Sequence, residues 1–156
     1  MSDPNIEILK YETLVRSIEN SVDTKLFNSL MVRYKDSGTI ADILNDGEYS
    51  CAFFVSSLLT LFEAIEKPHA TVANLKKTIV EDPKWSEVER ALAKPGDVVF
   101  YEKTVFDNGS AHEHVGFVVD TDSAVSTDYR QKNVARHDLD ARPITSIYRY
   151  SWNRPT

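Results

Sequence analysis

The sequence predicts an α+β domain in which a buried helix packs on one face of an antiparallel sheet. Two observations predict it. Apolar residues recur every three or four positions through the first half of the chain, whereas the second half alternates in short β-branched and aromatic runs. Helical segments followed by strand segments are typical of α+β proteins. At 156 residues with 42% hydrophobic content, a single domain over residues 1–156 can bury its own core.

The helical half divides into an N-terminal extension, expected to be helical over residues 1–45, and the start of the core. The segments "IEILKYETLVRSIENSV" and "LFNSLMVRYK" both have the apolar spacing of an amphipathic helix. Apolar residues from Cys51 to Ile65 cover nearly every direction around a helix, which predicts a helix buried on most sides and ended by Pro68. Shorter helical patterns follow in "TVANLKKTIVED" and "KWSEVERALA".

Five segments of the second half predict the sheet. Each is rich in β-branched or aromatic residues, and clusters of Gly, Asp and Asn separate them, which indicates about five antiparallel strands. With the buried helix they form the expected core over residues 46–156. The segments are "KPGDVVFYE", "HVGFVVD", "SAVSTD", "NVARHDL" and "ITSIYRYSW".

Composition excludes several classes of partner. The net charge is -6 and no Lys/Arg-rich run is present, so nucleic acid is not an expected partner. No run approaches the roughly 20 apolar residues of a membrane-spanning helix, so no membrane partner is expected. A single cysteine cannot form an internal disulfide, and the N-terminus lacks the apolar core of a signal peptide. The chain as written is therefore expected to be cytoplasmic.

Cys51 is the first candidate for chemistry because it stands at the expected start of the buried helix. A helix N-terminus favours the thiolate through its dipole and its unpaired N–H groups, which predicts a lowered pKa and a reactive thiol. The N–H groups of the same turn, including that of Ala52, can also serve as an oxyanion hole. The ordinary alternative is that Cys51 is a small buried hydrophobe.

A nucleophilic cysteine needs a base, and His114 is the best placed of the four histidines because it opens a strand. Its side chain is expected on the sheet face that meets the helix, where Gly116 leaves room for close packing. A third polar group is expected on the following strand. Ser126 and Asp128 share a face there, and Asp128 is preferred because it is charged. Ser126, Thr127 and His137 remain alternatives.

The pair "HEH" also permits a metal hypothesis, since His112 and His114 share a strand face and His137 can complete a three-histidine site. The helical zinc-hydrolase spacing of two histidines is absent, and no other ligand shows a recognisable spacing. We therefore expect no metal and no cofactor.

Three segments taken together resemble the NlpC/P60 superfamily of papain-like cysteine peptidases and its CHAP-type relatives. In that family a cysteine opens a buried helix, a Pro-Gly-Asp turn leads into the first core strand, and a His-Val-Gly strand supplies the base. The resemblance extends from Gly47 to Asp128. One departure is that many members have Asp-Cys-Ser-Gly at the nucleophile, where this chain has Ser50 to Phe53. The segments are "YSCAFFVSSLL", "KPGDVVFYE" and "HEHVGFVVDTDSAVST".

The resemblance implies a papain-like core in which Cys51 is the nucleophile, His114 the base and Asp128 the third polar residue. Tyr49 matches a tyrosine that many members place near the oxyanion site. It further implies hydrolysis of a peptide or amide bond in peptidoglycan stem peptides through a thioester, with a peptide or peptidoglycan fragment as partner. Without a signal peptide, we expect such an enzyme to be released by lysis, exported by a non-classical route, used on internalised wall fragments or directed at another amide bond.

A different class of function fits the same fold. The atypical residues after Cys51 and the missing export signal also suit a non-catalytic peptide- or glycopeptide-binding module. That hypothesis predicts a cleft lined by Tyr49, Trp85 and Tyr129.

Overall fold

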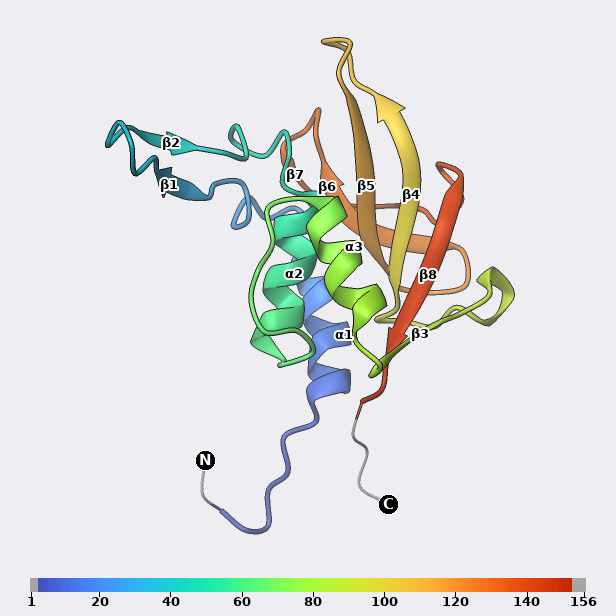
Figure 1. Cartoon of the computed structure of the whole chain (residues 1–156). Helices are drawn as coiled ribbons and strands as arrows, with labels where there is room; N and C mark the ends of the chain where they lie inside the picture. Colours follow the sequence, from blue (N-terminus) through green and yellow to red (C-terminus); the bar gives the residue numbers. More distant parts are fainter. Residues whose placement is uncertain (1–2, 153–156) are drawn as a thin grey trace.

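A computed structural model describes residues 3–152, in which three α-helices and eight strands form an α+β fold (Figure 1). One face of a six-stranded sheet is covered by the helices, and a separate two-stranded hairpin projects beside them. The helices are α1 (Lys10–Asn20), α2 (Cys51–Leu61), α3 (Val72–Glu81) and the short 3₁₀ turn η1 (Arg90–Leu92). The strands are β1 (Met31–Arg33), β2 (Ile40–Asp42), β3 (Trp85–Glu87), β4 (Val98–Val105), β5 (Ala111–Val118), β6 (Ser123–Asp128), β7 (Asn133–Asp138) and β8 (Ile144–Tyr150).

The six-stranded sheet has the order β3-β8-β4-β5-β6-β7, and neighbouring strands pair antiparallel. The five predicted strands are confirmed as β4 to β8. The predicted helix over "KWSEVERALA" is wrong, because this segment forms β3 and η1. Trp85 pairs with Tyr150 on β8, and its indole is buried against that ring, so sheet pairing overrides the helical pattern.

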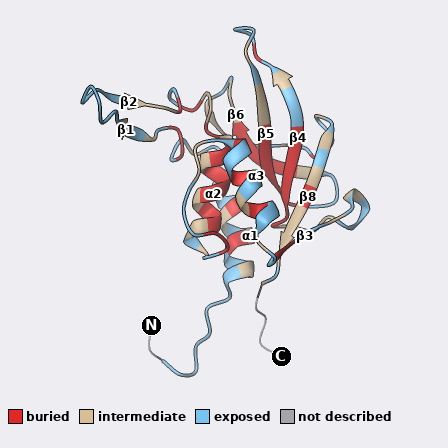
Figure 2. Ribbon diagram, viewed as in Figure 1, coloured by how far each residue is buried: buried red, intermediate tan, exposed pale blue. Residues whose placement is uncertain are grey.

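Helix α2 begins at Cys51 as predicted and lies against β5 and β6. Phe54 meets Phe117 of β5 edge to face with ring centroids 5.8 Å apart, and most of the helix is buried (Figure 2). The helix ends at Leu61, well before Pro68, because the backbone turns at Glu63, where φ is +63°. The prediction that Pro68 ends the helix is therefore wrong.

The two faces of the sheet carry different clusters of buried side chains. The helix-facing side holds the main core, including Phe100, Val115 and Phe117. The opposite side holds a smaller cluster closed over by residues 139–144 and the segment around η1, with Tyr101 and Val118 among its members. Because side chains alternate along a strand, neighbouring residues of β5 belong to different clusters.

A backbone hydrogen bond holds the Pro-Gly-Asp turn before β4 against β5. Gly96 has φ +88°, and its N–H donates to the carbonyl of Val118 at 2.9 Å. The Asp97 side chain is 2% exposed and accepts two hydrogen bonds from Arg149, both 2.8 Å long. This ion pair joins the start of β4 to β8.

The N-terminal extension is helical only in part. Its first predicted helix is confirmed as α1, which packs on α2 through Leu14 and Ile18. The second predicted helix is wrong, because "LFNSLMVRYK" contributes β1 of the projecting hairpin (Figure 1). Phe27 turns into the core against Phe54, whereas Met31 is exposed, so these apolar residues do not share one packed face.

Candidate active site

A tight turn sets the position of Cys51 at the start of α2. Asn45, Asp46 and Gly47 all have positive φ, and a Cβ at Gly47 would lie 2.6 Å from the Asn28 side chain. Asn28 donates to the carbonyl of Lys132 at 2.7 Å, which ties this turn to the segment between β6 and β7. Gly47 adopts the positive φ of this turn at no steric cost and leaves room for the Asn28 side chain, so this contact positions the chain just before Cys51.

The environment of the thiol differs from the prediction. Cys51 is half-buried, and burial raises the pKa of its thiol above the usual value. The backbone N–H groups of Val115 and Ala52, together with the charge of Arg142, act in the opposite direction but do not outweigh burial. The predicted lowering of the Cys51 pKa is therefore wrong, and the thiol is neutral near pH 7.

His114 is 6% exposed and is the fourth residue of β5, which begins at Ala111, so the expectation that His114 opens the strand is wrong. Strand alternation places its imidazole with Tyr101 on the sheet face opposite α2, with ring centroids 5.7 Å apart. The expectation that His114 and Gly116 face the helix is wrong. A Cβ at Gly116 would lie 3.0 Å from the Cβ of Ser126, so this glycine makes room for the neighbouring strand.

Burial also controls the charge of the imidazole. It lowers the pKa of His114 well below the usual value, and the positive charge of Arg142, with that of His137 when His137 is protonated, acts in the same direction. A neutral imidazole has one nitrogen that can accept a proton. His114 is therefore neutral at pH 7, and the same burial opposes the imidazolium that forms when a general base accepts a proton.

Cys51 and His114 line one cavity of about 520 Å³. Within residues 3–152 no hydrogen bond joins the two side chains. The thiol lies close to the backbone N–H of Val115, the residue that follows His114 on β5. The structure thus brings the predicted nucleophile and base to the same cavity, without direct contact between them.

Ser126 is the residue that contacts the imidazole. It is 2% exposed, and its Oγ lies 2.8 Å from His114 Nε2 and 2.7 Å from His137 Nε2. Asp128 has a different role. Its Oδ1 accepts the N–H groups of Arg130 and Gln131 at 2.8 and 3.0 Å, so its carboxylate shapes the turn after β6. The contact predicted for Asp128 is thus made by Ser126, one of the alternatives.

Aromatic side chains form one wall of the cavity. Tyr49 stacks on Phe106 with centroids 6.1 Å apart, and Phe106 stacks on Tyr129 at 4.0 Å. The His112 ring lies 4.5 Å from Phe106. Sequence reasoning missed Phe106 because it lies at the β4–β5 turn and reaches this wall only through tertiary packing. Trp85 is buried against β8 and does not line the cavity, so that prediction is wrong.

The histidines do not form a metal centre. Within residues 3–152, no group of three or more His, Cys, Asp or Glu side chains is arranged to hold an ion. The rings of His114 and His137 are 6.3 Å apart, and both Nε2 atoms lie within hydrogen-bond distance of the hydroxyl of Ser126. His112 instead lies against Tyr49 and Phe106.

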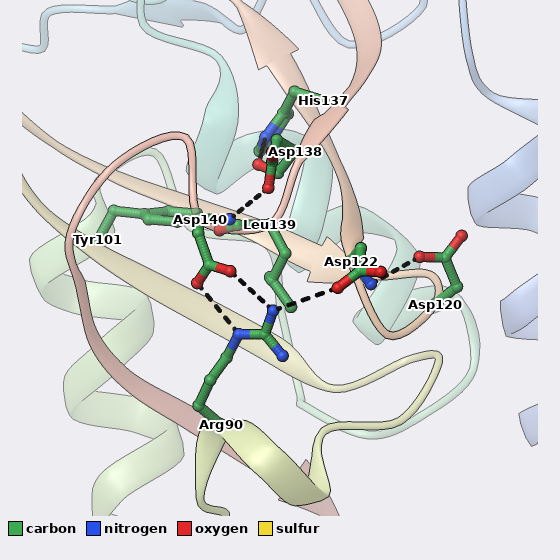
Figure 3. A network of polar contacts seen from close by, with 8 residues as sticks. All are labelled: Arg90, Tyr101, Asp120, Asp122, His137, Asp138, Leu139 and Asp140. Carbon is green, nitrogen blue, oxygen red and sulfur yellow. Dashed lines mark hydrogen bonds and ion pairs between the residues drawn. The ribbon is translucent and has the colours of Figure 1, made fainter.

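The loop beside His137 is held by several polar contacts (Figure 3). His137 Nδ1 lies 2.8 Å from the carbonyl oxygen of Asp138, and the Tyr101 hydroxyl donates to the carbonyl of Leu139 at 2.9 Å. Arg90 makes a two-pronged ion pair with Asp140. The His137 imidazole therefore lies beside a loop that is fixed to the sheet and to η1.

Comparison with known proteins does not assign this site. No protein-family model matches the chain, and no curated protein gives a significant sequence match. Of the helices between residues 3 and 152, none has both the length and the apolar character to cross a membrane.

Proposed function

We propose that the protein is a papain-like cysteine hydrolase of the NlpC/P60 type that cleaves a peptide or amide bond. Cys51 is the nucleophile and His114 the general base. The observation that carries the proposal is that Cys51, at the N-terminus of α2, and His114, whose imidazole is neutral, both line one cavity. A productive contact requires the His114 imidazole to reach this cavity from the sheet face opposite α2. Ser126 takes the part of the third polar group because it contacts His114 Nε2 at 2.8 Å.

The chemistry follows from the two neutral groups. When a carbonyl group enters the cavity, His114 removes the thiol proton as the Cys51 sulfur attacks the carbonyl carbon. The N–H groups at the start of α2, including that of Ala52, stabilise the resulting oxyanion. The imidazolium then gives its proton to the leaving amine, which leaves a thioester on Cys51. His114 then removes a proton from water, whose oxygen attacks the thioester carbonyl carbon. The C–S bond breaks, the acid product leaves, and the Cys51 thiolate regains its proton from the imidazolium.

Peptidoglycan stem peptides are the proposed substrate class. The cavity volume of about 520 Å³ is within the usual range for small-molecule sites. Its lining combines aromatic rings with Lys103, Glu48 and Glu113, which can pair with the carboxylates and amines of a short peptide. The resemblance to NlpC/P60 enzymes supports the same class.

The test is the rate of Cys51 alkylation by iodoacetamide at pH 7 in the unaltered protein and in His114→Ala. If His114 assists deprotonation, the variant reacts at least about 10-fold more slowly, since a positioned base contributes roughly 10²–10⁴-fold to such steps. His112→Ala is the matched control, because His112 lines the same cavity but contacts aromatic rings. Equal rates in the unaltered protein and His114→Ala would contradict the proposal.

A non-catalytic binding module is the second candidate. The aromatic wall formed by Tyr49, Phe106 and Tyr129 favours it, because such rings pack against peptides and sugars without chemistry. The raised pKa of Cys51 favours it too. This function predicts calorimetric binding of a stem peptide that is weakened in Phe106→Ala, with no product formed. Product formation would exclude it.

A further inference from the structure

We propose that His137 is a positioning residue that acts through Ser126 to hold His114 in the tautomer with a proton on Nε2 and a free lone pair on Nδ1. The catalytic meaning of this arrangement rests on the proposed hydrolase function. The hydrogen-bond directions themselves can be derived and tested without it.

The hydrogen bond between His137 and the backbone of β7 fixes the tautomer of His137. A carbonyl oxygen can only accept a hydrogen bond, so the contact of 2.8 Å between the Asp138 oxygen and His137 Nδ1 requires a proton on Nδ1. In a neutral imidazole only one nitrogen carries a proton. The Nε2 atom of His137 is therefore an acceptor.

The Ser126 hydroxyl links the two imidazoles and transmits this tautomer to His114. The hydroxyl lies 2.7 Å from His137 Nε2 and must donate its single proton to that acceptor. Ser126 Oγ then has only lone pairs to offer to His114 Nε2, which lies 2.8 Å away on the other side. His114 Nε2 must consequently be the donor, and its Nδ1 is left unprotonated.

The surroundings supply no competing partner for these atoms. The Tyr101 ring packs against both imidazoles, but its hydroxyl donates to the carbonyl of Leu139. Within residues 3–152, His114 Nδ1 makes no hydrogen bond to another residue. The loop that carries Asp138 is held by the backbone bond from Leu139 to Asp122 and by the ion pair of Arg90 (Figure 3).

Neutrality of His137 is a condition of this derivation, and burial favours it. Burial lowers the pKa of His137, and the charge of Arg142 acts in the same direction, although the bond to Asp138 opposes them. Asp128 and Asp138 carry the negative charges that favour protonation. At pH 7 the lowered pKa leaves His137 uncharged.

The consequence for the proposed reaction is specific. A base that takes the Cys51 proton must present a lone pair to the cavity, and Nε2 is already engaged by Ser126. The chain from Asp138 through His137 and Ser126 therefore makes Nδ1 the nitrogen that can accept a proton. When Nδ1 accepts it, the Nε2–H of the imidazolium still donates to Ser126.

The test is long-range ¹H–¹⁵N NMR of the imidazole rings in the full-length protein at pH 7, which identifies the protonated nitrogen of each histidine. We expect Nε2–H for His114 and Nδ1–H for His137. An Nδ1–H tautomer for His114 in the unaltered protein would overturn the proposal. This first measurement needs no variant, so misfolding cannot prevent a decision.

Two substitutions then test the role of His137. In His137→Leu the Ser126 hydroxyl loses its acceptor, and we expect His114 to become a mixture of tautomers. His137→Gln retains an amide oxygen toward Ser126 and should preserve the Nε2–H form. His69→Leu is the control, since the His69 ring contacts Thr78 and His69 is not among the residues that line the cavity. An unchanged His114 tautomer in His137→Leu would overturn the role of His137.

The alkylation rate of Cys51 separates this proposal from the proposed function. We expect His137→Leu to lower the rate at pH 7 by at least about 10-fold, and by at most the roughly 10⁴-fold that a wrong histidine tautomer costs a serine protease. The Gln variant should stay near the unaltered rate. If the tautomers are as derived but the rate is insensitive to His114, the hydrolase proposal fails and the hydrogen-bond assignment stands.

Discussion

Replacing Ser126 by alanine removes the hydroxyl that joins the two imidazoles. Both bonds are short, at 2.8 and 2.7 Å, and Ser126 is only 2% exposed. The change leaves a buried N–H of His114 without an acceptor. An unsatisfied buried polar group costs about 1–3 kcal/mol of unfolding free energy, which for a chain of this length lowers Tm by about 2–12 °C.

Urea unfolding followed by tryptophan fluorescence measures this loss of unfolding free energy. Ser56→Ala is the matched control, because Ser56 is also buried and its hydroxyl bridges two backbone groups of His69 at 2.7 and 3.2 Å. Both variants should lose similar stability, but only Ser126→Ala should change the NMR signals of His114 and slow alkylation of Cys51. Unfolding of Ser126→Ala within about 0.5 kcal/mol of the unaltered protein would refute the reasoning.

Three further perturbations test the electrostatics. Arg142→Met should raise the pKa of His114 in an NMR titration, because the arginine charge opposes protonation, whereas Arg130→Met should leave it unchanged. The contribution of His114 to the free energy of unfolding should be constant above about pH 6.5. At lower pH the free energy of unfolding should fall, because the unfolded state binds a proton on His114 that the folded state excludes; a free energy of unfolding that stays constant on the acid side would contradict this. Asp97→Asn should lower the unfolding free energy by about 3 kcal/mol, since Arg149 loses its buried carboxylate; a urea midpoint equal to that of the unaltered protein would exclude such a role.

Local patterns predicted the elements that carry the candidate site. The apolar run after Cys51 and the alternation around His114 each depend on residues close in sequence, so the start of α2 and the strand β5 followed directly. The structure of "LFNSLMVRYK" could not be predicted in this way, because Phe27 joins the core through contacts with α2 that no local pattern contains. Tertiary packing decided between helix and hairpin there.

Asp128 was chosen over Ser126 as the third polar residue because of its charge, and that criterion selected the wrong residue. Period-two counting put Ser126 and Asp128 on one face of the strand, and charge then favoured Asp128. Asp128 ends β6, however, and aspartate at a strand end often binds the N–H groups of the following turn.

The direction of the Cys51 pKa shift also could not be predicted from local sequence alone. The helix N-terminus correctly predicted groups that favour the thiolate, and the N–H of Ala52 is one of them. The opposing cost of burial depends on how completely the folded chain surrounds the thiol, which no local sequence pattern defines. Desolvation outweighs the local effect, so the direction of the pKa shift was wrong.

The most direct measurement of the central claim is mass spectrometry of the protein incubated with purified peptidoglycan stem peptides. Cys51→Ala, treated identically, is the control. We predict cleaved peptide in the reaction of the unaltered protein and a transient mass increase on Cys51 that matches an acyl thioester, with neither in the variant. Intact peptides and an unmodified Cys51 after prolonged incubation with the unaltered protein would contradict the hydrolase account.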